Sequence, residues 1–252
     1  MRLTVVGCSG SYPGPDSPAS CYLVEAEQEG RIWRILLDLG NGALGALQKF
    51  VDPLVIDAVL ISHLHADHCM DLCGYYVMRK YHPAGAAPSI PVWGPTGTAD
   101  RMATAYDLPL DPGMTAEFDF RAYPEEAFSV GPFTLQAVQV DHPVPAYALR
   151  VEADGRLLTY SGDTGPCVAL DQAALGADLL LAEASFVEGS ANPPSLHLTG
   201  KECGEAAARS GAGRLVLTHI PPWHDRAVCL DEARATYDGP IELAATGATF
   251  VV

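Results

Sequence analysis

The seven residues from Ser62 to His68 constrain the fold more than any other part of the chain. They read Ser-His-Leu-His-Ala-Asp-His, so His63, His65, Asp67 and His68 stand within six positions. The apolar residues just before them are typical of a buried strand, which would deliver the loop to a sheet edge. Imidazole nitrogens and carboxylate oxygens bind divalent metals, zinc most commonly. In an extended turn the 63/65 pair points one way and the 67/68 pair another, so this loop could serve two ions.

Length and composition favour a globular enzyme with a sizeable core. The chain has 252 residues, of which 48% are hydrophobic and 18% charged, and this suits one large domain or two small ones. No apolar run approaches the roughly 18–20 residues that span a bilayer. The first residues have a strand pattern in place of a signal peptide. We therefore expect a cytoplasmic protein that does not insert into a membrane.

The seven cysteines do not suggest a disulfide framework, because they are odd in number and scattered along the chain. Cys69 and Cys73 follow the histidine loop closely enough to be considered as extra metal ligands. Their helical spacing favours small buried side chains instead.

The net charge of −16, from 15 Lys and Arg against 31 Asp and Glu, restricts the substrate. Proteins that hold long RNA or DNA use clustered basic residues, which release counterions from the phosphates. Basic residues here come in pairs at most, as in Arg79-Lys80. A small anionic substrate attracted by metal ions is compatible with this charge, whereas a long polyanion is harder to accommodate.

Strand-like and helical segments alternate in two successive blocks. Strand patterns cover 2–7, 20–26, 32–39, 57–62, 90–93, 115–121, 126–130, 133–141, 147–153, 157–161, 178–183, 214–218, 241–244 and 248–252, and helical patterns cover 43–50, 69–81, 97–107, 167–175, 200–210 and 225–236. Thr199 and Glu202 have the spacing of a capping box at a helix start. Asp154-Gly155 predicts a hairpin turn. The pattern predicts an α/β fold with two sheets between helix layers.

Three more polar residues directly follow apolar strand-like runs. These are His142, Asp163 and His219. Each taken alone has an ordinary explanation, because aspartate caps turns and histidine often closes a strand. Their joint placement after the histidine loop favours a shared metal site at the ends of several strands.

The four residues of the histidine loop and the three strand-end residues together resemble the ligand series of the metallo-β-lactamase fold. The resemblance covers almost the whole chain and implies a single domain over 1–252, an αββα sandwich of two mixed sheets between helix layers. It implies two divalent ions, zinc first, with manganese and iron as alternatives. The ligands it implies are His63, His65 and His142 for one ion, Asp67, His68 and His219 for the other, and Asp163 as the bridge. Lactamase-type enzymes often have a cysteine at the bridging position, so the aspartate disfavours β-lactam hydrolysis.

A second pair is similar to residues of ribonuclease Z-like phosphodiesterases. Leu181-Ala-Glu183-Ala-Ser185 and Leu196-His197-Leu-Thr199 resemble their glutamate and His-x-Thr segments. The resemblance implies that His197 faces the scissile phosphate and that Glu183 orients it. Phosphodiester hydrolysis needs a protonated group near the leaving oxygen, and a carboxylate would keep His197 protonated. Asp67 would orient or accept the proton of the attacking water. The alternative is a strand-end carboxylate and a loop histidine without a catalytic role.

Several segments are closer still to bacterial metallo-β-lactamase-fold cyclic-nucleotide phosphodiesterases of the atypical class II type. They are 7–11, 14–20, 62–69, 161–165 and 217–223. The chain departs from ribonuclease Z in two places. Residues 143–162, between His142 and Asp163, are filled by one hairpin and leave no room for a basic tRNA-binding arm. Ser17-Pro18-Ala19-Ser20 stands where those enzymes have an Arg-Asn step.

The sequence therefore predicts a metal-dependent phosphodiesterase that acts on a small phosphodiester, a 3′,5′-cyclic nucleotide in the first instance. The first alternative is a ribonuclease Z-like RNA or tRNA 3′ endonuclease, and the second is a glyoxalase II-like thioesterase or other ester hydrolase. A non-catalytic binding module is disfavoured because all seven ligand positions are filled. His82 and His224 do not fit the ligand series. Trp223 could stack a base, and the apolar helical segments are compatible with a homodimer.

Overall fold

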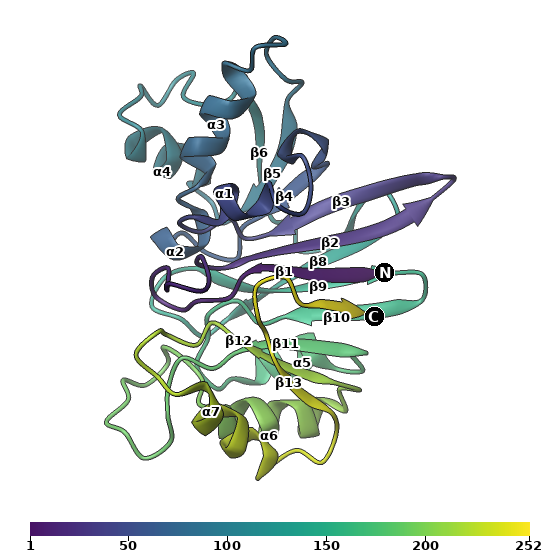
Figure 1. The fold of residues 1–252 in the computed structure, drawn as a ribbon, viewed down its shortest axis with the longest axis vertical. Coiled ribbons are helices and arrows are strands. Elements are labelled where there is room, and N and C mark those ends of the chain that lie inside the picture. Colours follow the sequence, from purple (N-terminus) through teal and green to yellow (C-terminus); the bar gives the residue numbers. More distant parts are fainter.

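Two seven-stranded sheets pack face to face, and helices cover the outer face of each (Figure 1). The structure is a computed structural model that describes residues 1–252. Both sheets are mixed, so the predicted αββα sandwich is confirmed. None of the helices has the length and apolar character needed to cross a membrane.

The first sheet contains the N-terminal strands and the last strand of the chain, in the order β14-β1-β2-β3-β4-β5-β6. Its strands are β1 (Arg2–Gly7), β2 (Cys21–Gln28), β3 (Arg31–Leu37), β4 (Ala58–Leu60), β5 (Ile90–Gly94), β6 (Phe118–Ala122) and β14 (Thr249–Val251). Strands β3 to β6 run parallel. The connections between them contain α1 (Ala43–Leu47), a 3₁₀ turn (Pro53–Val55), α2 (Ala66–Cys69), α3 (Leu72–Lys80) and α4 (Thr98–Ala105).

The second sheet has the order β13-β12-β11-β10-β9-β8-β7. Its strands are β7 (Phe128–Val130), β8 (Phe133–Val140), β9 (Ala146–Ala153), β10 (Arg156–Tyr160), β11 (Leu179–Glu183), β12 (Leu215–Thr218) and β13 (Ile241–Leu243). Strands β10 to β13 run parallel. Helices α5 (Val168–Ala174), α6 (Gly200–Ser210) and α7 (Arg226–Arg234) cover its outer face.

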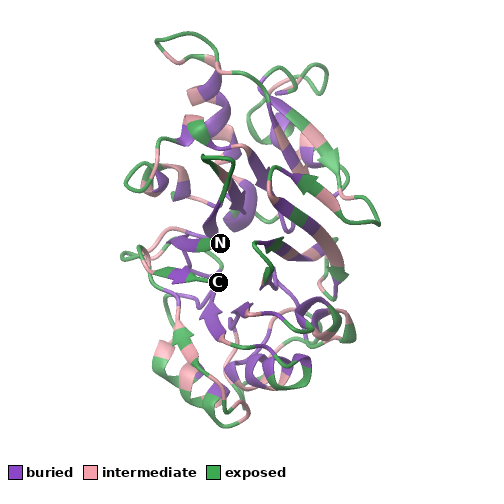
Figure 2. Ribbon diagram, turned by 90° about the vertical axis from the view of Figure 1, so that its right-hand side faces the viewer, coloured by how far each residue is buried: buried purple, intermediate pink, exposed green.

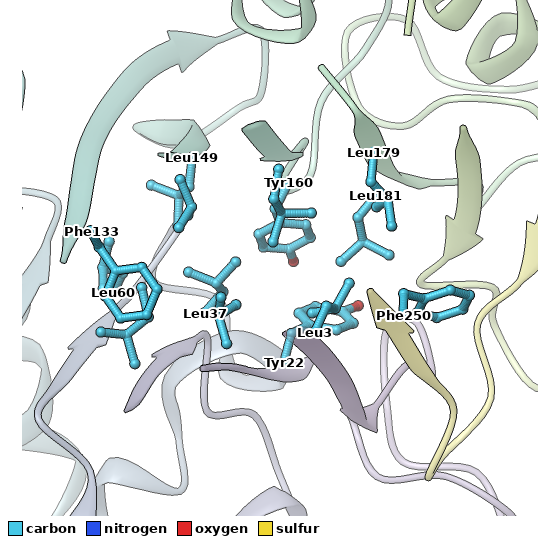
Figure 3. Packing of buried hydrophobic residues seen from close by; sticks show 14 of the residues in the cluster. Leu3, Tyr22, Leu37, Leu60, Phe133, Leu149, Tyr160, Leu179, Leu181 and Phe250 are labelled. Carbon is cyan, nitrogen blue, oxygen red and sulfur yellow. The ribbon is translucent and has the colours of Figure 1, made fainter. Parts of the chain in front are cut away.

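Side chains alternate between the space inside the two sheets and the helix layers outside. In β3, Ile35 and Leu37 belong to the cluster between the sheets, whereas Leu36 packs toward the helices. Tyr22 and Tyr160 face one another across this inner layer, with ring centroids 4.9 Å apart (Figure 3). Burial is concentrated on the central strands, and the exposed residues lie in loops, at strand ends and on the outer sides of the helices (Figure 2). Each fully buried leucine stabilises the fold by about 1.5–3 kcal/mol relative to an exposed one.

The predicted helices and strands are confirmed with small shifts at their ends. The capping box at α6 is present, because Thr199 accepts the N–H of Glu202 and Glu202 accepts the N–H of Thr199. The segment 115–117 is wrongly predicted as strand. The carbonyl of Met114 accepts the N–H groups of Glu117 and Phe118, which makes a turn before β6.

The loop that carries the histidines is not the extended turn that the sequence suggested. Asp67 and His68 lie in the short helix α2, and the helical segment predicted over 69–81 begins inside it. The helix breaks before α3 because the N–H of Asp71 donates to the carbonyl of Leu39 at 3.1 Å. Gly40 allows this close approach, since a Cβ there would lie 1.9 Å from the carbonyl oxygen of Asp67. The end of β3 therefore holds α2 in place.

Candidate metal centre

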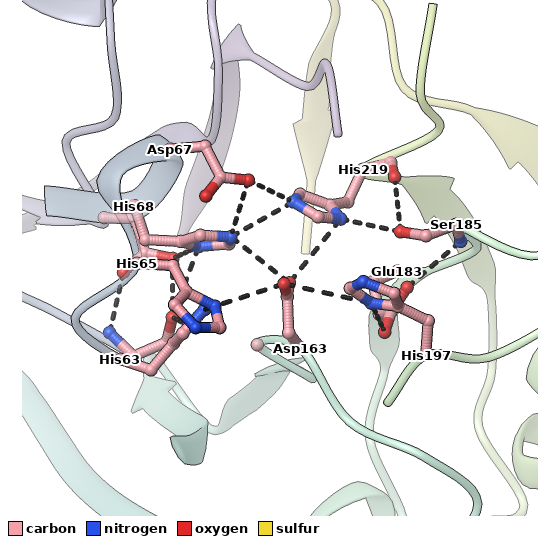
Figure 4. Close-up of polar contacts among 12 residues, drawn as sticks. His63, His65, Asp67, His68, Asp163, Glu183, Ser185, His197 and His219 are labelled. Atoms are coloured by element: carbon pink, nitrogen blue, oxygen red, sulfur yellow. Dashed lines mark hydrogen bonds and ion pairs between the residues drawn. The ribbon is translucent and has the colours of Figure 1, made fainter. Parts of the chain in front are cut away.

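All seven predicted ligands converge at the edge of the sandwich where both sheets send out loops (Figure 4 shows six of them). They form two groups of donors that share Asp163, with the donor atoms of each group within 4.8 Å of one another. The first group is His63, His65, His142 and Asp163, and the second is Asp67, His68, Asp163 and His219. The loop after β4 contributes to both groups. The loops after β8, β10 and β12 contribute one residue each.

In the first group three ring nitrogens point toward one another. Nδ1 of His65 lies 3.0 Å from Nε2 of His63 and 3.3 Å from Nε2 of His142. Nitrogen atoms around a tetrahedral zinc ion lie about 3.4 Å apart when each bond is about 2.0–2.1 Å. The spacing of the three rings therefore fits one shared cation better than two unrelated hydrogen bonds.

The second group has the same character. Nε2 of His68 and Nε2 of His219 lie 3.1 Å apart. Oδ2 of Asp67 is 3.1 Å from Nε2 of His219 and 3.5 Å from Nε2 of His68. Two nitrogens and one carboxylate oxygen thus meet at one point in the buried part of the site.

Asp163 lies between the groups and gives an independent test of whether they suit metal ions. The side chain is 2% exposed, and its Oδ1 atom accepts no hydrogen bond. Nε2 of His68 is 3.3 Å from that oxygen, and Nε2 of His63 is 3.6 Å from Oδ2. A buried carboxylate oxygen without a donor costs free energy, and a cation would satisfy it. The residues present therefore fit metal binding.

In His142 and His219, the ring nitrogen that points away from the two groups donates a hydrogen bond to a residue outside them. Nδ1 of His142 donates to the carbonyl of Leu196 at 3.0 Å. Nδ1 of His219 donates to Oγ of Ser185 at 2.8 Å, and this hydroxyl donates to the carbonyl of His219. This network assigns the tautomer in which Nε2 carries the free lone pair that a metal needs.

Asp38 is the residue that sequence reasoning missed. It is fully buried at the end of β3, and its Oδ2 lies 2.7 Å from Nδ1 of His68. Oδ2 also accepts the hydroxyls of Ser62 and Tyr160, each at 2.8 Å, while Oδ1 accepts the N–H of Ser62. The sequence signal was an aspartate inside the apolar run 35–39, two residues before Gly40. Asp38 links the candidate ligand His68 to both sheets.

The pKa values of three of the histidines suit metal ligands. Burial is the largest cause that lowers the pKa values of His63, His65 and His142, and it keeps these rings in the neutral form that binds metals. Burial also opposes the charged form of His68. There, however, the carboxylates of Asp163 and Asp38 raise the pKa well above its usual value. The negative charge around His68 therefore attracts a proton or a cation.

Glu183 and His197 form a pair beside the two groups. Glu183 is fully buried at the end of β11, and its Oε1 lies 2.9 Å from Nδ1 of His197. The same nitrogen is 3.9 Å from Oδ2 of Asp163. Burial lowers the pKa of His197, but the charge and hydrogen bond of Glu183 more than offset this effect and raise the pKa to about 9. His197 is thus a protonated group next to the candidate metal ligands.

The predicted ligands and the Glu183–His197 pair are all brought together. His82 lies at the end of α3, outside both groups, as expected. His224 is also outside both groups and meets the ring of its neighbour Trp223 edge to face, with ring centroids 5.9 Å apart.

Comparisons with known proteins agree with this geometry. Residues 33–220 match the family model described as beta-lactamase superfamily domain. The chain is 44% identical over 255 residues to an uncharacterized protein of Mycobacterium leprae (strain TN), covering 99% of this chain and 88% of that protein. It is 28% identical over 307 residues to ribonuclease Z of Myxococcus xanthus (strain DK1622), covering 99% and 97% of the two chains.

A solved structure agrees over nearly the whole length. The chain is 26% identical over 255 residues to the probable metallo-hydrolase YhfI of Bacillus subtilis (strain 168), covering 98% of each. The crystal structure of this metallo-β-lactamase fold protein aligns with a TM-score of 0.87 and 25% identity, covering 99% of this chain and 98% of the other. The chain therefore belongs to the beta-lactamase superfamily and has the metallo-hydrolase fold of that family.

Proposed function

We propose that the protein is a dinuclear metallo-phosphodiesterase that hydrolyses a small phosphodiester, a 3′,5′-cyclic nucleotide in the first instance. The observation that carries the proposal is the Glu183–His197 pair beside Asp163. Hydrolysis of a thioester does not need a strong proton donor next to the ligands, because thiolates leave without much acid assistance. A poor alkoxide leaving group does need one.

In this proposal His63, His65 and His142 would hold one zinc ion, Asp67, His68 and His219 would hold a second, and Asp163 would be shared by both groups. The excess of imidazole over carboxylate donors favours zinc over magnesium or calcium. When bound, the ions would supply Lewis-acid chemistry by polarising phosphate oxygens and making water a better nucleophile at neutral pH.

The side chains of the protein supply the proton transfers. Asp67, whose Oδ2 belongs to the second group, would orient a water molecule and accept its proton. His197, protonated and fixed by Glu183, would donate a proton to the departing 3′-oxygen. Proton donation of this kind contributes roughly 10²–10⁴-fold to the rate.

The surroundings of the site favour a small substrate. Residues 143–162, between His142 and Asp163, form mainly the β9–β10 hairpin, which belongs to the second sheet. The net charge of −16 disfavours a long polyanion. Both observations support a small phosphodiester over tRNA.

Ribonuclease Z-like cleavage of RNA is the second candidate. It is favoured by the likeness to ribonuclease Z of Myxococcus xanthus, which extends over both chains almost entirely. This candidate predicts that a precursor tRNA binds, and that its binding weakens steeply with salt.

A substrate panel with the metal-reconstituted protein tests the proposal. It contains cyclic AMP, cyclic GMP, 2′,3′-cyclic nucleotides, bis(p-nitrophenyl) phosphate, a precursor tRNA and an acyl thioester. We expect hydrolysis of the 3′,5′-cyclic nucleotides. Cleavage of the precursor tRNA with no turnover of cyclic nucleotides would establish the second candidate, and activity confined to the thioester would overturn both.

A further inference from the structure

Two exposed aromatic side chains lie together beside the candidate metal centre. Tyr12 is 45% exposed and Trp223 is 59% exposed. Their ring centroids are 5.3 Å apart with an angle of 35° between the planes. Two neighbouring aromatic rings that are both open to solvent offer flat faces on which a planar ligand can stack.

Trp223 is tied to the second ligand group through the chain. It follows His219 by four residues, which limits the distance between their Cα atoms to about 14 Å even when fully extended. The segment turns back on itself, because the N–H of His224 donates to the carbonyl of Pro221 at 3.0 Å. The Cα atom of Trp223 therefore lies closer to that of His219 than this limit.

Tyr12 is held against the same segment from the N-terminal loop. The N–H of Gly10 donates to the carbonyl of Ile220 at 3.3 Å, and Oγ of Ser9 donates to the carbonyl of Tyr12 at 2.7 Å. A Cβ at Gly10 would lie 2.1 Å from the carbonyl oxygen of His219, so this loop touches the candidate ligand directly. The two rings are thus mounted on backbone that is fixed relative to the metal centre.

We infer that Tyr12 and Trp223 form a stacking platform for the nucleobase of the substrate. This inference rests on the proposed function, since a phosphodiester placed at the ligand groups would carry its base toward the rim. The platform recognises a flat aromatic ring without reading its hydrogen-bonding edge, so it would accept adenine and guanine alike. It would distinguish nucleotides from phosphodiesters that lack a base.

Fluorescence gives a direct test of stacking, because the other tryptophans are already covered. Trp33 lies under the guanidinium of Arg31, 3.7 Å from its ring centroid, and Trp93 packs on Phe128 at 4.1 Å. We expect 5′-AMP to quench tryptophan emission of the metal-loaded protein in a saturable way. Ribose 5-phosphate, which has no base, should leave the emission unchanged. Trp223→Phe should remove the quenching by AMP.

Steady-state kinetics test the consequence for catalysis. Loss of one stacking partner weakens base binding by roughly 5- to 100-fold. Trp223→Ala should raise KM for cyclic AMP by at least fivefold and leave kcat within about twofold, because stacking acts equally on substrate and transition state. Trp223→Phe should retain most of the affinity. Tyr81→Ala, which removes an aromatic ring that is 65% exposed at the end of α3, is the matched control.

The cyclic phosphate of methyl riboside has no base to stack. It therefore shows whether Trp223→Ala acts through stacking or through a displacement of the nearby candidate ligand His219. Its hydrolysis should be the same in the wild-type protein and in Trp223→Ala. An equal loss for this substrate and for cyclic AMP would overturn the inference, as would equal quenching by AMP and ribose 5-phosphate. If the wild-type protein hydrolyses no phosphodiester, the proposed function fails, and quenching by AMP alone then decides whether the platform exists.

Discussion

Oε1 of Glu183 lies 2.9 Å from Nδ1 of His197, and the rest of this carboxylate is held by the backbone. Oε1 also accepts the N–H groups of Thr164 and Leu198, at 3.2 and 3.4 Å, and Oε2 accepts that of Ser185 at 3.0 Å. Three backbone donors fix the carboxylate at the end of β11 before any substrate arrives. The position of His197 is therefore imposed by the second sheet, which also presents Asp163 and His219.

His197→Ala should slow hydrolysis of a 3′,5′-cyclic nucleotide by roughly 10²–10⁴-fold, because the leaving oxygen would depart without a proton donor. Metal content should be unchanged, since His197 lies outside the two ligand groups that share Asp163. The measurement is kcat together with metal analysis of the same preparation. His82→Ala is the control, and full activity of His197→Ala with normal metal content would refute the assignment.

Glu183→Gln should reduce kcat by about tenfold or more, though less than His197→Ala does. The neutral amide removes the charge that raises the pKa of His197 to about 9, so less of the ring stays protonated. It also leaves one backbone N–H facing an amide NH₂, which costs about 1–3 kcal/mol of stability. Kinetics and thermal unfolding separate the two effects. A variant with a lower Tm but unchanged kcat would make Glu183 purely structural.

Asp38→Asn should weaken metal binding by about 10–100-fold, because it replaces a charged acceptor behind the candidate ligand His68 by a neutral one. The affinity is measured by competition with a chromophoric zinc chelator. Tyr160→Phe is the matched comparison, since it removes a single hydroxyl donor to the same oxygen. We expect it to have a smaller effect, and an Asp38→Asn protein that retains metal as well as the wild type would contradict the role assigned to Asp38.

The convergence of the seven candidate ligands was predictable because each follows an apolar strand in the sequence, and strands that run in the same direction bring such ends to one edge. Asp38 was not predictable in the same way. Its function depends on Tyr160 from the other sheet and on His68 from α2, and neither is near it in sequence. An aspartate in an apolar run has no local partner that would reveal it.

The conformation of the histidine loop was mispredicted for a similar reason. Four ligands in six residues were compatible with an extended turn, in which neighbouring side chains diverge. The helix α2 arises from contacts with the end of β3, where Asp71 donates its N–H to Leu39 and Gly40 lies against the carbonyl of Asp67. Tertiary contacts of this kind outweigh the local preference of a short loop.

Gly40→Ala tests this close approach. The new methyl group would lie 1.9 Å from the carbonyl oxygen of Asp67, so α2 or β3 must shift. We expect a loss of about 1–3 kcal/mol in the free energy of unfolding, together with weaker metal binding. Gly45→Ala in α1 is the control, because nothing lies within 4 Å of its Cβ. It should stabilise the protein by about 0.5–1 kcal/mol. Equal behaviour of the two variants in urea would disprove the argument.

Metal should stabilise the folded protein through Asp163, whose buried Oδ1 has no hydrogen-bond donor. A ligand that binds only the folded state adds about 2.7 kcal/mol at a concentration of 100 times its Kd. Zinc added to chelator-treated protein should therefore raise the Tm by several degrees, and Asp163→Ala should abolish most of this shift. Asp178→Asn should keep the full shift, because Asp178 pairs with Arg156 and the N–H of Leu157 at the start of β10, the opposite end of the strand from Asp163. Differential scanning calorimetry with and without zinc makes the comparison. A zinc-dependent shift that survives in Asp163→Ala would mean that the two groups bind metal independently of the residue they share.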